Sequence, residues 1–339
     1  MRTEREEKGL TLQTEILRGD PLPWLLEPDA ANPAVRYFAL RDLLDKSKDD
    51  PEVRRARTDI MTTGPVPAIL AAQDPEGYWV KSGSGYSPKY RATAWQIIFL
   101  AELGADPGDE RVRRGCEYLL GHSLAITGAF SVNRVPVPSG ALHCLNGNLL
   151  YALISLGYAD DPRVQTALTW KAQAITGEGE ISYYRSGTAG PGFACGVNLG
   201  QPCGWGATKA LKALSAVPQD QCTPEVQRAI ERGVEFLLSR DPAVADYPYT
   251  ERVSSSWFKF GFPLSYWSDV LESTAVLVAS GYGRDPRLER AIRFILGKQD
   301  AQGRWKLENS LNGKMWIDIE KRGKPSKWIT LRALRVLRG

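Results

Sequence analysis

The polar and apolar positions of the chain alternate between two kinds of segment, at a period of roughly 50–65 residues. The first kind begins with an Asp or Thr before a Pro or an acidic residue, and an apolar stripe follows on one face. This pattern is typical of the start of an amphipathic helix. Such segments lie at 49–57, 108–116, 160–168, 222–230 and 284–292. We expect a helix with one buried and one charged face at each.

The second kind of segment is apolar and rich in small residues on almost all sides. Copies lie at 32–44, 91–104, 146–157, 206–216, 273–281 and 328–339. A helix that is apolar all round is buried on both sides, and a one-faced helix lies outside it. The alternation predicts an all-α fold, an α/α toroid of about five to six helical hairpins with inner and outer rings. An open solenoid is the alternative, but it would leave its concave face polar.

The predicted toroid spans residues 32–339 as a single domain. Residues 1–31 have no repeat match and are expected to be an N-terminal extension, in which 21–28 could close one end of the ring. The connection 245–267 is long and aromatic, which is typical of a lid over the mouth of a barrel.

Two heptapeptides, QDPEGYW at 73–79 and QDAQGRW at 299–305, carry Gln, Gly and Trp at one spacing. This spacing resembles the Gln-x-x-x-Gly-x-Trp (QW) motif of the terpene cyclase and protein prenyltransferase toroids, and the similarity covers nearly all of 32–339. In that superfamily the motif ties an outer helix to the next inner one, so a structural role is expected for both copies. The resemblance implies a transferase or cyclase that acts on an isoprenoid in a central cavity.

The charge pattern and the cysteine content indicate which classes of partner the protein can bind and in which cellular compartment it functions. The net charge is +4, but Lys and Arg are interleaved with Asp and Glu, which argues against a nucleic-acid-binding stripe. The sequence has no apolar stretch long enough to span a membrane and no signal peptide, so a cytoplasmic protein is expected. Five cysteines fit a reducing compartment, in which functional cysteines are metal ligands or nucleophiles.

Alignment of the apolar segments by their C-terminal ends brings rare side chains to one level, where the inner helices begin. Thiolate, imidazole and carboxylate together select zinc. The candidate zinc ligands are His143, Cys144, Cys195 and Cys203. We expect Asp269 to be a further ligand, or a carboxylate that contacts the ligands without binding the metal. By resemblance, the protein prenyltransferases hold zinc with Asp, Cys and His at inner-helix starts. The alternative is that the cysteines are buried core residues.

An alternative interpretation is that the protein catalyses its reaction with a carboxylic acid as the proton donor. The segment SDVLESTAVL at 268–277 is similar to the acidic motif of the protonating squalene and diterpene cyclases, with Glu272 at the position of the proton donor. That resemblance implies catalytic roles for Asp269 and Glu272 without a metal. Rings and cations near the same level are candidates for substrate binding: Tyr90, Arg91, Trp205, Trp267, Lys327 and Trp328.

Three functions follow from these patterns. The first is a zinc enzyme of the terpene cyclase and prenyltransferase-like superfamily that acts on an isoprenoid or a thiol-containing substrate. The second is a metal-independent terpenoid cyclase with Glu272 as its acid. The third is a non-catalytic toroid that binds a small molecule or peptide in its central cavity.

Overall fold

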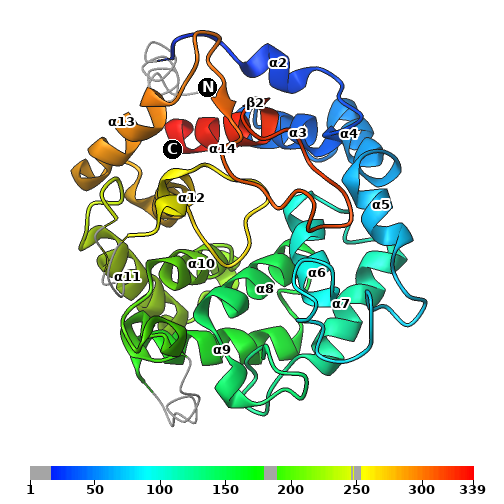
Figure 1. The fold of residues 1–339 in the computed structure, drawn as a ribbon, viewed down its shortest axis with the longest axis vertical. Coiled ribbons are helices and arrows are strands. Elements are labelled where there is room, and N and C mark those ends of the chain that lie inside the picture. The colour runs from blue at the N-terminus through cyan, green and yellow to red at the C-terminus, as the bar shows by residue number, and fades with distance from the viewer. Residues whose placement is uncertain (1–16, 179–188, 246, 248–252) are drawn as a thin grey trace.

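The computed structural model describes residues 17–178, 189–245, 247 and 253–339, and its helices form two concentric rings (Figure 1). The inner ring consists of α3 (Pro33–Phe38), α6 (Thr93–Glu102), α8 (His143–Ser155), α10 (Gly204–Leu214), α12 (Val270–Leu277) and α14 (Lys327–Arg338). The outer ring consists of α4 (Pro51–Thr62), α5 (Pro65–Ala71), α7 (Glu110–His122), α9 (Pro162–Thr176), α11 (Pro224–Leu238) and α13 (Glu289–Gly297). The predicted all-α toroid is therefore confirmed.

Short elements complete the described chain. The helix α2 (Leu22–Leu26) precedes the ring, and two-residue strands β1 (Trp305–Lys306) and β2 (Pro325–Ser326) pair antiparallel before α14. Single π-helical turns extend α3 over Ala39–Leu43 and α12 over Val278–Tyr282. Three-ten turns lie at Pro138–Gly140, Pro191–Phe193, Gly196–Asn198, Gln219–Gln221, Ser255–Phe258 and Pro286–Leu288.

The predicted helix-start signals cap the outer helices. Each capping side chain accepts a hydrogen bond from a backbone N–H of the first turn, which satisfies a donor that the helix itself leaves free. The caps are Asp50, Asp109, Asp161, Thr223 and Asp285, with donor–acceptor distances of 2.8, 2.9, 2.8, 3.3 and 2.9 Å. The last cap differs in detail, because a three-ten turn at Pro286–Leu288 comes before α13.

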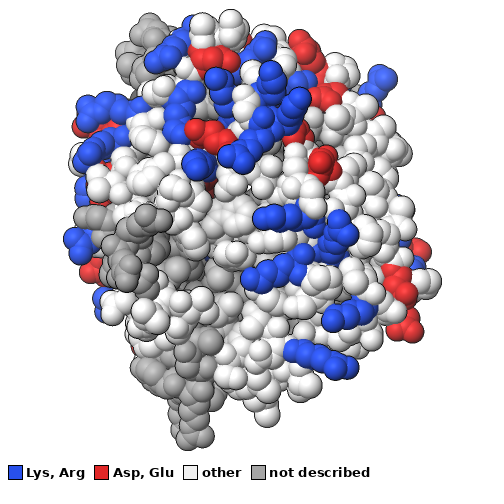
Figure 2. Space-filling model, viewed as in Figure 1, with Lys and Arg blue, Asp and Glu red and all other residues white. Residues whose placement is uncertain are grey.

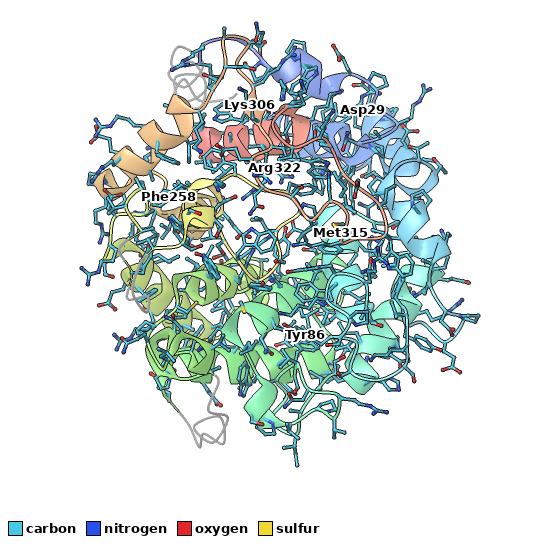
Figure 3. All side chains as sticks on the ribbon, in the orientation of Figure 1. Asp29, Tyr86, Phe258, Lys306, Met315 and Arg322 are labelled. Atoms are coloured by element: carbon cyan, nitrogen blue, oxygen red, sulfur yellow. The ribbon has the colours of Figure 1, made fainter. Side chains whose placement is uncertain are left out.

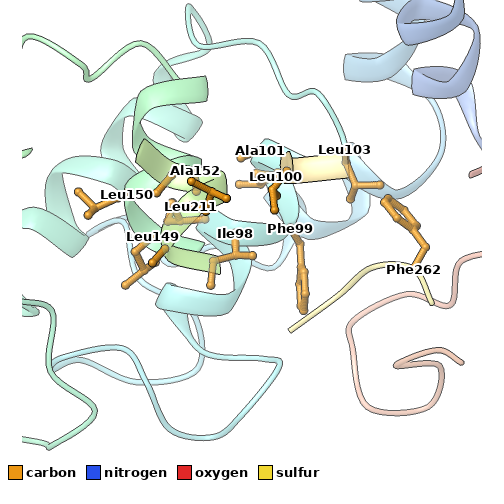
Figure 4. Packing of buried hydrophobic residues seen from close by; sticks show 14 of the residues in the cluster. Ile98, Phe99, Leu100, Ala101, Leu103, Leu149, Leu150, Ala152, Leu211 and Phe262 are labelled. Atoms are coloured by element: carbon orange, nitrogen blue, oxygen red, sulfur yellow. The ribbon is translucent and has the colours of Figure 1, made fainter. Parts of the chain in front are cut away.

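The inner helices are buried on nearly all sides, as their sequences predict. Every residue of α6 from Thr93 to Ala101 is buried, and Figure 4 shows its apolar side chains against α8 and α10. Helices α8 and α10 approach most closely at Gly147, where a Cβ atom would lie 2.4 Å from the backbone of Lys209. Only glycine leaves room for that contact.

The two ends of the repeat array meet and close the ring. Helix α14 packs on α2 and α3, and the Trp328 indole N–H donates to the Asn32 side-chain oxygen at 3.1 Å. The side chains of Arg335 and Asp42 form an ion pair across the same seam. Closure excludes the open-solenoid alternative.

The two Gln–Gly–Trp segments make matching contacts at their junctions. The Trp79 indole N–H donates to the carbonyl of Ile69 at 2.8 Å, and Trp305 repeats this contact with Ile295 at 2.7 Å. In both copies the tryptophan is fully buried and its backbone N–H donates to a threonine on the next inner helix, Thr93 or Thr330. Each tryptophan thus joins an outer helix to the following inner helix.

The N-terminal segment that the structure describes packs on the ring. Helix α2 lies against α3 and α14, and Leu25 is completely buried there. Residues 1–16 lie outside the described residues, so the boundary predicted at residue 31 remains a prediction.

Candidate functional site

The end of the ring at which the inner helices begin is filled by the chain itself. Residues 262–267, here called the plug, cross this end (Figure 1). The side-chain amide of Asn148 donates to the carbonyl of Ser265 at 2.7 Å, which ties the plug to α8. The ring of Phe262 stacks on Trp328 with 4.0 Å between centroids. The plug belongs to the connection that the sequence suggests as a lid; that mobile role stays a prediction.

His143 is held by two protein partners at the start of α8. Its Nε2 lies 2.9 Å from the carbonyl of Gly190, which can only accept, so Nε2 carries the proton. Its Nδ1 then accepts from the side-chain nitrogen of Lys171 at 2.9 Å. Burial and the neighbouring Lys171 hold the pKa of His143 well below its usual value, so the ring is neutral. Coordination of a metal would require one of these two hydrogen bonds to break.

Cys144, Cys195 and Cys203 lie near one another at the same end of the ring, as the alignment of the inner segments predicts. Cys203 is the N-cap residue of α10, and its sulfur accepts from the backbone N–H of Gly206 at 3.5 Å. Burial raises the pKa of the Cys144 thiol to about 12 and that of Cys203 to about 11. Both are therefore protonated at neutral pH without a metal ion, and zinc binding would have to release these protons.

These residues do not fit a zinc ion as they are arranged here. Within the described residues, no group of three or more His, Cys, Asp or Glu side chains is placed to share a metal ion. His143 is already engaged at both nitrogens.

Asp269 lies at the start of α12, completely buried, and both of its oxygens are used within the protein. One oxygen caps the helix by accepting from the backbone N–H of Glu272 at 2.7 Å, and the other accepts from Gly261 at 3.0 Å. The guanidinium of Arg332 on α14 pairs with the same carboxylate at 3.1 Å. This arrangement joins α12 to α14, and it corresponds to a structural role in place of the predicted catalytic one.

Glu272 lies one turn further along α12, where both carboxylate oxygens bind the ammonium of Lys209 on α10 at 2.7 and 2.6 Å. Burial would raise the pKa of Glu272, but the charges of Lys209, Lys212 and Arg332 outweigh it and lower the pKa to about 2. A proton donor to an alkene must instead hold its proton at working pH. The geometry therefore argues against the acid role that the sequence suggests for Glu272.

The predicted substrate-binding residues are dispersed. Trp328 alone among them lines the central cavity described below. Arg91 is exposed and lies over the ring of Trp316, and the ammonium of Lys327 is 3.4 Å from Asp29. The others surround the plug: Tyr90 is buried against Trp95, and Trp205 and Trp267 both contact Tyr266.

The central cavity lies on the other side of the plug, in the half of the ring where the inner helices end. Its volume is about 550 Å³, and all six inner helices contribute to its wall. The apolar part of the wall includes Phe38, Leu264, Val276 and Val336, together with the stacked rings of Phe262 and Trp328. The cavity opens beside Ser215, Ala216 and Ala279, which are partly or fully exposed. The sequence places the candidate site at the opposite end of the same helices, and that location stays a prediction.

Charged groups on the cavity wall occur in equal numbers, and each cation has a carboxylate partner on the wall or beside it. Three carboxylates, from Asp42, Glu102 and Glu272, face three cations, from Lys212, Arg332 and Arg335. Lys212 pairs with Glu102 and lies 3.5 Å from Glu272, and its ammonium is 4.2 Å from the centre of the Tyr151 ring. Burial would lower the pKa of Lys212, but the two carboxylates raise it, so the ammonium stays charged.

The sequence patterns do not identify most of these wall residues. One signal was available, since Glu102, Lys212 and Arg332 are charged residues in otherwise apolar inner segments. Asp42, Tyr151 and Arg335 carry no comparable signal, because they lie near helix ends where polar residues are ordinary.

Comparisons with known proteins show structural similarity, but they do not identify a family. No protein-family model matches the chain, and no curated protein matches it. A crystal structure of a protein from Actinoplanes is similar over 98% of both chains, with 15% identity and a TM-score of 0.43. The type II terpene cyclase MstE from Scytonema is similar over 80% of this chain and 94% of its own, with 15% identity and a TM-score of 0.28. A variant of MstE in complex with merosterolic acid A gives 14% identity, 80% and 93% coverage and a TM-score of 0.29. These values identify no shared activity.

Proposed function

We propose that the protein binds a neutral amphiphilic small molecule of isoprenoid type in its central cavity. The observation that carries this proposal is the cavity wall itself, which combines a continuous apolar and aromatic part with a charge-balanced polar part. A volume of about 550 Å³ is in the ordinary range for a small-molecule site. The apolar body of the ligand would lie against Phe262 and Trp328, and its polar end beside Lys212 and Glu102.

The charge balance favours a neutral ligand over a diphosphate. Three carboxylates and three cations line the wall, and each cation already has a carboxylate partner. A polyanion would have to displace these carboxylates and would leave them buried and unpaired, which is costly. A hydroxyl or carbonyl group can instead exchange hydrogen bonds with the wall without changing any charge.

The geometry supports binding more directly than catalysis. Glu272 is held as a carboxylate, so the cavity offers no proton donor at the position that the sequence suggests. Among the three functions drawn from the sequence, the ligand-binding toroid is thus the one that the site favours. Conversion of the bound molecule is a separate question, and the experiment below addresses it.

Binding can be measured with farnesol and farnesyl diphosphate as matched probes, by titration calorimetry and native mass spectrometry. We expect saturable binding of the alcohol and binding of the diphosphate that is weaker by about tenfold or more, or ~1.4 kcal/mol. Ala275→Trp places a large ring in the cavity and should abolish binding of the alcohol, whereas Ala301→Trp, in an exposed turn, should not. Tighter binding of the diphosphate, or unchanged binding by Ala275→Trp, would overturn the proposal. Product analysis of the same incubations identifies an enzyme if the alcohol is converted.

A further inference from the structure

The connections that lead into the inner helices form one face of the molecule, here called the mouth face: 72–92, 123–142, 189–203, 253–268 and 298–326. These connections touch one another across the ring. The indole N–H of Trp316 donates to the carbonyl of Arg91 at 3.1 Å, and the ammonium of Lys89 lies 5.0 Å from the ring centre of Tyr266. The hydroxyl of Ser123 donates to the carbonyl of Ser84 at 2.6 Å. Residues far apart in the sequence therefore share this surface.

The mouth face is strongly basic, as Figure 2 shows for one view of it. Its connections carry twelve Lys or Arg against six Asp or Glu. Ten of these cations are exposed and, within the described residues, form no ion pair: Lys81, Lys89, Arg91, Arg134, Lys259, Lys306, Lys314, Lys321, Arg322 and Lys324. By contrast, Arg111, Arg163 and Arg287 on the outer helices all pair with carboxylates. Figure 3 shows Lys306 and Arg322 on the same side of the molecule as Tyr86 and Met315.

The opposite end of the ring has the reverse charge. The connections that leave the inner helices, 44–50, 103–109, 156–161, 215–223 and 281–285, carry nine Asp against three Lys or Arg. Such a separation of charge orients a protein toward an anionic surface with one face forward, before any contact is made.

The mouth face also carries most of the exposed large apolar side chains. Six of the eight in the described residues lie on it: Val80, Ile126, Val135, Val197, Leu199 and Trp316. Four are at turns and are almost fully free, with exposed fractions of 96% for Ile126, 70% for Val135, 75% for Val197 and 76% for Leu199. Aliphatic side chains at loop tips do not contribute to the binding of a nucleic acid, which uses stacking and hydrogen bonds. They gain free energy when they enter the hydrocarbon edge of a bilayer, and tryptophan is common at that interface.

We propose that the mouth face docks on an anionic lipid bilayer, with the ten unpaired cations over the head groups and the aliphatic loop tips inserted between them. No described helix is long and apolar enough to cross a membrane, so this attachment is to one leaflet and depends on charge and insertion together. The inference is independent of the proposed ligand, because the plug separates the mouth face from the central cavity.

Cosedimentation of the full chain with vesicles tests the proposal. We expect binding to phosphatidylcholine vesicles that contain phosphatidylglycerol, little binding to phosphatidylcholine alone, and weakening by salt. The variant Lys321→Glu, Arg322→Glu, Lys324→Glu should weaken binding by about tenfold or more. The matched control Lys48→Glu, Arg54→Glu, Arg55→Glu makes the same change of net charge toward the other end of the ring and should weaken it much less.

A second variant separates insertion from simple charge attraction. Ile126→Ser, Val135→Ser, Val197→Ser and Leu199→Asn together should reduce vesicle binding by about tenfold, because the apolar contribution is lost. Asn suits position 199, where φ is +54°. The control Leu44→Ser removes the exposed leucine of the opposite end. If wild-type protein does not bind the anionic vesicles, or if the loop-tip variant binds them unchanged, the proposal is overturned. In the latter case, competition by an RNA duplex would identify a general polyanion surface. Farnesol titration of both variants in solution shows separately whether the cavity still functions.

Discussion

Lys209 and Glu272 form a buried ion pair that joins two neighbouring inner helices, with the lysine Nζ 2.6 Å from Oε2 of the glutamate. Burial lowers the pKa of Lys209 in spite of Glu272, while the surrounding cations lower the pKa of Glu272 against burial. Glu272 is thus a carboxylate at neutral pH. The pair therefore stabilises one arrangement of α10 and α12 beside the cavity, and it accounts for the glutamate that resembles a catalytic acid in the sequence.

Removal of one partner of this buried pair should lower the free energy of unfolding much more than removal of an exposed pair. Glu272→Gln leaves the Lys209 ammonium buried without a carboxylate, so we expect a loss of ~3–5 kcal/mol in the free energy of unfolding. Urea denaturation measures this loss. The control Glu235→Gln breaks the exposed pair with Arg232 and should cost no more than ~1 kcal/mol. A loss below ~1 kcal/mol for Glu272→Gln would show that the pair is not formed.

The same pair predicts how stability depends on acid. The folded pKa of Glu272 is about 2, against an ordinary value of 4.5, so its contribution is complete above 4.5 and is lost as the pH falls toward 2. The stability difference between wild type and Glu272→Gln should accordingly shrink between about pH 5 and about pH 3. Urea midpoints over this range test the sign. A difference that grows with acid would mean that the folded state binds the proton more tightly than the unfolded chain.

Lys171 should produce a second signature of the same sign, between neutral and alkaline pH. Burial lowers its pKa from 10.5 to about 7. Between these values the unfolded chain holds a proton that the folded protein lacks, so stability rises with pH by about 1.4 kcal/mol per unit. Lys171→Met should remove this slope between about pH 7 and about pH 9, whereas Lys48→Met, at an exposed position, should keep it. Equal slopes in all three proteins would show that Lys171 is charged when folded.

The junction tryptophans should contribute to the stability of the fold and not to ligand binding. Trp305→Ala empties a fully buried site and frees the carbonyl of Ile295, so we expect a loss of ~3–5 kcal/mol. The exposed Trp316→Ala should cost ~1 kcal/mol or less. Denaturation gives both numbers, and farnesol titration of any folded Trp305 variant should match wild type. Loss of ligand binding without loss of stability would assign the tryptophan to the site.

Metal content tests the zinc interpretation of the sequence. Because no three His, Cys, Asp or Glu side chains among the described residues are placed to share a metal ion and His143 is engaged at both nitrogens, we expect substoichiometric zinc after purification without chelator. Plasma mass spectrometry of wild type and of Cys203→Ala measures it. One zinc per chain in wild type, absent from the variant, would restore the zinc site and would require the bond between His143 and Lys171 or Gly190 to rearrange.

The helices and their order could be predicted because their signals are local. An Asp or Thr cap, an apolar stripe and an all-apolar segment each act within a few turns of chain, and the caps at Asp50, Asp109 and Asp161 form as expected. Burial of the tryptophans in the two repeated heptapeptides follows from the same regularity. The shared level of His143 and Cys203 is also correct, since it depends only on helix length.

The chemistry of that level could not be predicted, because it depends on partners that are distant in sequence. Lys171, on an outer helix, hydrogen-bonds to His143, and Lys209, on α10, forms an ion pair with Glu272. A buried charge is decided by what faces it, and a linear pattern does not show which side chain does.

The chain alone therefore determines an all-α toroid, its two rings and its junctions, because each rests on periodicity and short-range hydrogen bonds. The tertiary structure decides which end of the ring is open. It places the plug across one end and leaves a charge-balanced cavity at the other. It also brings cations from separate connections onto a single face, where they outnumber the carboxylates twelve to six. The physical reason is that electrostatic interactions depend on distance in space, and residues such as Arg91 and Lys314 come into contact only when the ring closes.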